Sequence, residues 1–333
     1  MASYLLRRFV YMIATLLLIS LVTFIVIQLP PGDWLTSYIT TLESRGQEVD
    51  QSEIAALRDQ YGLDQPQLAR YFKWLGGFLR GRMGVSFSFN RPVVDLIAER
   101  LPITVLVSIF ALLFSYLIAI PTGIYSATHQ YSFADYTFTA LGFIGISIPS
   151  FLLGIIVLFG AFKWLGVDVG GLFSDQYIGE AWSFGKFLDF LKHIPVPMII
   201  IGAAGTATLI RVMRGCLLDE LRQQYVITAR AKGVSEPVLL FRYPVRMAMN
   251  PIISTIGWVL PAIFSGQTIT AVVLRLSTMG PLLLRALISQ DMYLAGSVVM
   301  LMSMLVVIGT LISDMLLVVF DPRIRFESRE ELQ

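Results

Sequence analysis

The sequence carries little charge, one cysteine and two histidines. Only 14% of its 333 residues are Asp, Glu, Lys or Arg, and 56% are hydrophobic, whereas a soluble domain carries about 25% charged residues. A polytopic membrane protein is therefore predicted. The net charge of +2 gives no reason to expect a nucleic-acid partner. The single Cys216 excludes an intramolecular disulfide and is typical of a small apolar residue.

Several kinds of chemistry are missing. The phosphate-binding pattern G-x-x-x-x-G-K-[ST] does not occur, so the chain has no nucleotide site of that type. His129 and His193 stand in separate loops without metal-ligand spacing, and each is interpreted as a surface residue. A membrane enzyme is disfavoured, because the chain offers neither a nucleophile–base pair nor a set of metal ligands.

Six apolar segments are interpreted as membrane-spanning helices, because a bilayer core of about 30 Å needs about 20 apolar residues. They are residues 9–29, 102–126, 136–162, 195–210, 250–274 and 292–320. The predicted fold is therefore all-α. It divides into a first segment (1–29), an extracytoplasmic loop (30–101), a five-helix core (102–320) with a cytoplasmic loop (211–249), and a tail (321–333).

The segment at residues 9–29 is interpreted as an uncleaved helix, not as a signal peptide. It has 21 apolar residues without a charge, and the sequence that follows it, beginning at Pro30, has no small-residue cleavage site. Cations then set the orientation. Loop 211–249 holds seven Lys or Arg against three Asp or Glu, and loop 163–194 holds three against four. Both termini are therefore predicted to be cytoplasmic.

The interiors of the first five segments lack ionisable side chains, and Asp314 is the exception in the sixth. We interpret Asp314 as a structural residue near the cytoplasmic end, since a proton relay would need partners that are missing. Ion-coupled transporters usually place acids or bases at mid-depth. The pattern therefore disfavours a secondary transporter and predicts a passage that takes its energy from a partner.

The loop at 30–101 is predicted to contain two short amphipathic helices on the outer rim. In residues 52–61, Ile54, Leu57 and Tyr61 share one helical face. In residues 66–79, where Pro66 suits a first helical position, the shared apolar face is Leu68, Tyr71, Phe72, Leu75 and Leu79.

The stretch "YVITARAKGVSE", residues 225–236, stands between two membrane segments. Helix formers predict a helix over 217–231, which ends with Lys232 in its last turn and Gly233 at its C-cap. Ala229 and Ala231 permit close approach, and Tyr225 adds area and a hydroxyl. A small, basic helix of this kind suits a groove in a partner. An ordinary connecting loop with positive-inside charges explains the residues equally well.

This stretch resembles the cytoplasmic coupling motif of binding-protein-dependent ABC transporter permeases of the dipeptide/oligopeptide/nickel branch, whose members commonly read T-A-R-A-K-G. The opening "LLRRFVYMIATLLLISLVTFIVIQLPPGD", the external "YGLDQPQLARYFKWLGGFLRGRMGVSFSFNRPVVDLIAERLPITV" and the ending "DPRIRF" are similar to the same family in the same order. Together these segments cover most of the chain.

The resemblance implies an importer permease in a prokaryotic inner membrane, without a cofactor of its own. It implies pairing with a second, homologous permease, two cytoplasmic ATPases bound below, a solute-binding protein docked outside, and surrounding lipid. The coupling helix would fit a cleft on the ATPase, and nucleotide-driven closure would reorient the permeases as nearly rigid bodies. The coupling roles implied for this chain are a close fit by Ala229 and Ala231, a turn at Gly233, and contacts by Tyr225 and Lys232.

The chain departs from the family where the fifth segment ends. Ala271 stands at the position of a family Glu, and residues 277–280 replace a Pro-Gly run, whereas Asp291 still matches. Small peptides are the family's usual substrate, and oligosaccharides are the alternative that this departure keeps open. Polar residues of the fifth segment, Ser265, Gln267 and Thr268, are candidates for the pathway lining; Gln267 leads, because its amide is costly to expose to lipid.

Overall fold

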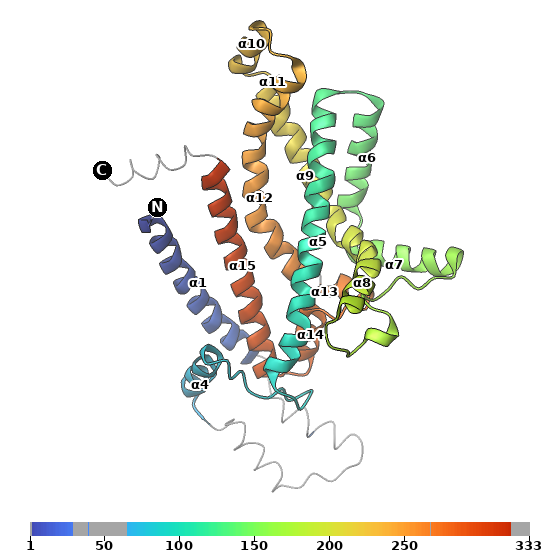
Figure 1. Cartoon of the computed structure of the whole chain (residues 1–333). Coiled ribbons are helices and arrows are strands. Elements are labelled where there is room, and N and C mark those ends of the chain that lie inside the picture. Colours follow the sequence, from blue (N-terminus) through green and yellow to red (C-terminus); the bar gives the residue numbers. More distant parts are fainter. Residues whose placement is uncertain (1, 29–38, 40–64, 267, 321–333) are drawn as a thin grey trace. The chain divides into compact units, whose positions relative to one another are not determined.

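The computed structural model describes residues 2–28, 39, 65–266 and 268–320, without the side chains of 2–7, 27–28, 257–266 and 316–320. Across these residues the regular elements are helices, apart from one isolated antiparallel bridge between Val85 and Pro92. The all-α prediction is therefore confirmed. Figure 1 shows the helices in chain order. They divide into two compact units, residues 1–104 with 277–307 and residues 105–276 with 308–333.

The first unit combines the beginning of the chain with a later segment. Its helices are α1 (Ala2–Gln28), α4 (Gln67–Leu79), the start of α5 (Val93–Thr128), α14 (Met279–Ile288) and the start of α15 (Met292–Phe320). Its core is largely aromatic. Phe24 of α1 packs with Tyr71, Trp74 and Phe78 of α4 and with Met300 of α15.

The second unit contains most of the remaining helices. These are the rest of α5, α6 (Phe133–Ser147), α7 (Ser150–Gly160), a π turn (Ala161–Leu165), a 3-10 turn (Asp175–Tyr177), α8 (Phe184–His193), α9 (Pro195–Leu221), α10 (Gln224–Ala231), α11 (Glu236–Arg242), α12 (Pro244–Gly266), α13 (Thr268–Val273) and the end of α15. Its core lies between α5, α9 and α12, where the Tyr116 and Thr255 hydroxyls are 2.6 Å apart.

Among the residues that the structure describes, four helices are long and apolar enough to cross a membrane, and a bent pair makes a fifth span if it counts as one. The four are Arg8–Val26, Val93–Thr128, Pro195–Leu221 and Met292–Met315. They correspond to the first, second, fourth and sixth predicted segments. The fifth predicted segment falls on α12 and α13, where the side chains of 257–267 lie outside the described residues. The six-span topology therefore stays a prediction.

The third predicted segment, 136–162, is not one continuous helix. It breaks between α6 and α7, and the two parts are bent by 102°. Ile148 has extended backbone angles (φ −89°, ψ 120°) and Pro149 precedes α7. The residue before a proline is driven out of the helical region by clash with the proline ring, so the Ile148–Pro149 pair explains the break.

Two of the helices that extend beyond their predicted bounds are α5 and α9. α5 begins at Val93, inside the predicted external loop, and α9 continues to Leu221, inside the predicted cytoplasmic loop. The 36 residues of α5 span about 54 Å at 1.5 Å per residue, well beyond a hydrocarbon core of about 30 Å. Apolar content alone therefore underestimated the lengths of α5 and α9, because their ends are polar.

The helix predicted over residues 66–79 is confirmed as α4, with Pro66 at its N-cap. The predicted packing face was largely wrong. The buried side chains of α4 are Tyr71, Trp74 and Phe78, whereas Leu68, Phe72 and Leu79 are 68%, 66% and 75% exposed. The face of Tyr71, Trp74 and Phe78 gains more contact area against Phe24 than the face of Leu68, Phe72 and Leu79 would. The other predicted helix, 52–61, lies outside the described residues.

Candidate functional site

The stretch singled out by its sequence forms two short helices beyond the end of α9. α9 stops at Leu221, Gln223 has extended angles (φ −72°, ψ 148°), and α10 and α11 follow. Figure 1 shows α10 and α11 together beyond α9 and α12. We call residues 224–242 the coupling hairpin. The single helix predicted over 217–231 is therefore divided at Arg222 and Gln223.

Gly233 ends α10 as predicted. Its φ is +78°, in the left-handed region that favours glycine. The Gly233 amide donates to the Arg230 carbonyl at 3.0 Å, and the Val234 amide donates to the Ala229 carbonyl at 3.3 Å. These two bonds are the Schellman pattern that closes helix C-termini. Lys232, just before the turn, is exposed.

Ala229 lies inside the hairpin. It is 8% exposed and packs with Val226 and Leu239, both fully buried, while Val234 and Tyr243 flank them. The small side chain thus allows α10 to approach α11. The predicted fit of Ala229 to a partner needs revision, because a buried methyl group cannot provide much docking surface.

Two polar contacts hold the hairpin, and sequence reasoning missed both. Arg230 donates from Nε to Glu236 Oε1 at 2.5 Å and from Nη2 to Oε2 at 3.1 Å, and this ion pair lowers the pKa of Glu236. The Tyr225 hydroxyl donates to the Glu220 carboxylate at the end of α9. Burial and this acidic neighbour raise the pKa of Tyr225. The only sequence signal was opposite charge on either side of the Gly233 turn.

The outer surface of the hairpin combines apolar and basic side chains. Ile227, Val238 and Phe241 are 48%, 49% and 62% exposed. The exposed residues beside them are Thr228, Arg230, Ala231, Lys232 and Arg242. Exposed large apolar residues rimmed by charges are typical of a protein-binding surface.

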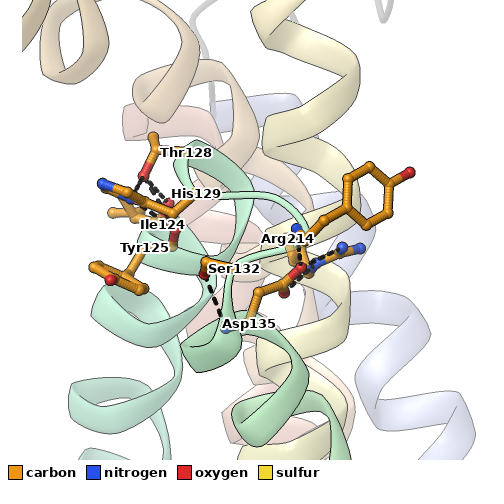
Figure 2. A network of polar contacts seen from close by, with 8 residues as sticks. Ile124, Tyr125, Thr128, His129, Ser132, Asp135 and Arg214 are labelled. Carbon is orange, nitrogen blue, oxygen red and sulfur yellow. Dashed lines mark hydrogen bonds and ion pairs between the residues drawn. The ribbon is translucent and has the colours of Figure 1, made fainter.

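An ion pair ties α6 to α9 (Figure 2). Arg214 donates from Nε and Nη2 to the two carboxylate oxygens of Asp135, each at 2.9 Å. The Tyr131 amide adds a third bond to Asp135 at 2.9 Å, and the Asp135 side chain is only 3% exposed. Paired, bidentate geometry satisfies a buried carboxylate. The sequence pattern placed Arg214 among the loop cations and did not indicate this contact, because the partners are far apart in the chain.

The predicted pathway residues are only partly described. Gln267 lies outside the described residues, as does the Ser265 side chain, and Thr268 is half-buried. Nearby, Thr270 is buried and its hydroxyl lies 2.9 Å from that of Ser150, so α13 and α7 are joined there. Ala271, at the position where the resemblance leads us to expect a Glu, is 4% exposed. A buried methyl group thus stands where a charge was expected.

In the first unit, Asp291 organises the start of α15. Its carboxylate accepts bonds from the Ser86 hydroxyl at 2.5 Å and from the Ser88 amide at 3.1 Å, and it caps the Leu294 amide at 3.1 Å. Asp291 is fully buried. The family-matching Asp therefore holds the 86–88 loop against the helix N-terminus.

Family comparisons cover nearly the whole sequence. Residues 119–326 match the family described as binding-protein-dependent transport system inner membrane component, and residues 1–108 match its N-terminal companion. The oligopeptide transport system permease protein AppB of Bacillus subtilis is 32% identical over 98% of this chain and 100% of its own length. The dipeptide transport system permease protein DppB of Escherichia coli K12 is 27% identical over 98% and 99%.

The chain belongs to the inner-membrane components of binding-protein-dependent transport systems. It is a permease subunit of such an importer, as the resemblance in its motifs predicted.

Proposed function

We propose that this permease carries small peptides delivered by an extracytoplasmic binding protein. In this proposal it pairs with a second, homologous permease, and two cytoplasmic ATPases hydrolyse ATP, since the chain lacks a nucleotide motif. The names of the two relatives, an oligopeptide and a dipeptide transport permease, support the peptide class. Six spans with both termini inside are part of the proposal and follow from the cation distribution.

The coupling hairpin carries the proposal. Its apolar core and the Arg230–Glu236 pair support it as a small preformed body, which limits the ordering cost of binding. Its exposed Ile227 and Phe241 suit a groove on an ATPase, and Lys232 suits an acidic rim. Ala231 permits close approach, and Gly233 sets the turn. Ala229 acts from within, by holding α10 against α11.

The helices on either side of the hairpin would transmit its movement to the membrane-spanning part of the protein. α9 leads into α10 and α11 is followed by α12, and the Tyr225–Glu220 bond braces the first joint. The Asp135–Arg214 pair extends the connection to α6. A push on the hairpin would therefore move α6, α9 and α12 together, as a hinge-type transition requires.

The docking surface is tested by a charge placed on it. Ile227→Asp should abolish co-purification of the ATPase subunits with the complete importer, and vanadate-sensitive, ATP-dependent uptake in vesicles should fall at least tenfold. Ile178→Asp is the matched control, because Ile178 is 66% exposed on a loop before α8. Normal ATPase binding by Ile227→Asp would refute the docking assignment.

The substrate and the pathway need separate tests. Oligosaccharide transport is the alternative that the uncharged, buried Ala271 favours, and equilibrium binding of peptides and sugars to the cognate binding protein would decide between them. An ion-coupled mechanism would show uptake that resists vanadate. We keep Gln267, Thr268 and Ser265 as proposed pathway residues; Gln267→Leu should reduce uptake.

A further inference from the structure

α4 has two apolar faces, and only one is covered. Tyr71, Trp74 and Phe78 are buried, whereas Leu68, Phe72 and Leu79 are between 66% and 75% exposed. A helix that is apolar on both sides is usually covered on both sides. The exposed stripe therefore needs an apolar solvent or a partner.

The contacts of α4 with α1 fix the depth of this stripe. Ser20, fully buried, donates to the Leu17 carbonyl at 2.8 Å and lies 2.8 Å from the Tyr71 hydroxyl. Since a hydroxyl has a single hydrogen, Tyr71 is the donor to Ser20. Phe24 also packs edge-on against Tyr71, with 5.3 Å between the ring centres.

These α1 residues lie inside a candidate membrane span, Arg8–Val26. From Ser20 to Val26 the helix rises by about 9 Å, at 1.5 Å per residue. Interfacial amphipathic helices lie about 5–10 Å into the boundary between headgroups and acyl chains. α4 is thus attached at a depth where lipid, and not bulk water, surrounds the protein.

The charge around α4 is of one sign. Residues 65–94 contain five cations and no Asp or Glu. Three of the cations, Lys73, Arg80 and Arg82, are exposed on or just after α4. Apolar side chains flanked by Lys and Arg are the composition of helices that bind anionic lipid surfaces.

We propose that α4 is an interfacial helix that inserts Leu68, Phe72 and Leu79 into the leaflet at the C-terminal end of α1, with Lys73 and Arg80 at anionic lipid headgroups. Under the proposed topology this is the outer leaflet. The helix would then fix the level of the external segment in the membrane. This inference is independent of the ATPase docking and of the substrate.

Spin-label accessibility tests the insertion. Phe72→Cys is made in the complete importer with Cys216→Ala, labelled with a nitroxide, and reconstituted in vesicles of phosphatidylethanolamine and phosphatidylglycerol. Leu18→Cys, 63% exposed on α1, is the lipid reference, and Ile178→Cys, 66% exposed on the loop before α8, is a reference outside the spans. The label at 72 should collide with oxygen as at 18 and be protected from a water-soluble nickel chelate. Access to the chelate would overturn the proposal, and so would protection from both reagents, which would indicate a protein cover.

Headgroup recognition is tested by exchanging one charge. Lys73→Gln should reduce the preference of the importer for spin-labelled phosphatidylglycerol over phosphatidylcholine at least twofold. Lys192→Gln, an exposed lysine on α8, is the matched control and should leave the preference unchanged. An unchanged preference in Lys73→Gln, or an equal loss in both variants, would overturn the headgroup contact.

Discussion

α4 and the coupling hairpin are both short helical elements outside the long spans, yet they are held in different ways. α4 is fixed by aromatic side chains, with Phe24 lying 6.2 Å from Trp74 between ring centres. The hairpin has a core of three small or medium apolar residues and relies on a glycine turn, an ion pair and a tyrosine hydrogen bond. The difference fits their proposed surroundings, lipid for α4 and an aqueous protein groove for the hairpin.

The largest expected effect concerns the aromatic attachment. Trp74→Ala should destabilise the protein by about 3–5 kcal/mol, because it leaves a cavity between α4 and α1. Thermal unfolding of the purified protein measures the loss. Trp164→Ala, at a side chain that is 76% exposed, is the control and should cost far less. Similar losses in both variants would mean that burial on α4 contributes little.

A charge inside the hairpin should have the next largest effect. Ala229→Glu places an unpaired carboxylate among buried apolar groups, at a cost of about 3 kcal/mol or more, and should uncouple transport without preventing membrane insertion. Ala231→Glu, on the exposed side of α10, should keep the hairpin protected in hydrogen exchange while weakening ATPase binding. Normal uptake by Ala229→Glu would contradict both the packing and the coupling roles.

The glycine turn should matter less, and only through its backbone angle. Gly233→Ala forces a side chain into φ +78° and should destabilise the hairpin by about 1–2 kcal/mol. Gly215 in α9 also has open space where a Cβ would stand, yet it carries no positive φ. Gly215→Ala should therefore be neutral or stabilising by about 0.5–1 kcal/mol. Hydrogen exchange of the hairpin in both variants checks the contrast.

The smallest effect is expected at the exposed Arg230–Glu236 pair. Because Arg230 lowers the folded-state pKa of Glu236, the pair stabilises above the ordinary pKa of a Glu and loses this contribution as pH falls through the lowered value. Arg230→Gln should therefore differ slightly from the parent at about pH 7, and the difference should vanish only when the pH is well below the ordinary Glu pKa of about 4.3. Salt should shrink the difference as well. A gap that persists in acid would exclude the ionic explanation.

Much of the architecture could be predicted, because long apolar runs have few alternatives to spanning a membrane. α1, α5, α9 and α15 follow from this rule. The break at Ile148–Pro149 had a local signal, the proline itself. The long apolar run from 136 to 162 nevertheless led to the prediction of a single span. The packing face of α4 had no local signal. Its buried face and its exposed face are both apolar at helical spacing, and only the tertiary contact with Phe24 selects one.

The candidate site was predicted in part. Gly233 followed from local turn chemistry, which a short stretch of sequence contains. The burial of Ala229 depends on Leu239 in the next helix, and the Asp135–Arg214 pair joins residues from different helices. Contacts of this kind depend on how helices meet, which residue spacing does not give.

The seam between α5 and α9 limits how this permease can move. Ala119, Gly123 and Ala127 recur every fourth residue on α5, and Leu209, Met213 and Leu217 do so on α9. A methyl group added at Gly123 would stand 2.7 Å from the Met213 side chain. The two helices therefore pack closely, and a gradual sliding of one along the other would create steric clashes. If α9 moves during the transport cycle, α5 must move with it as one rigid body. The conformational change must then take place at other helix–helix contacts.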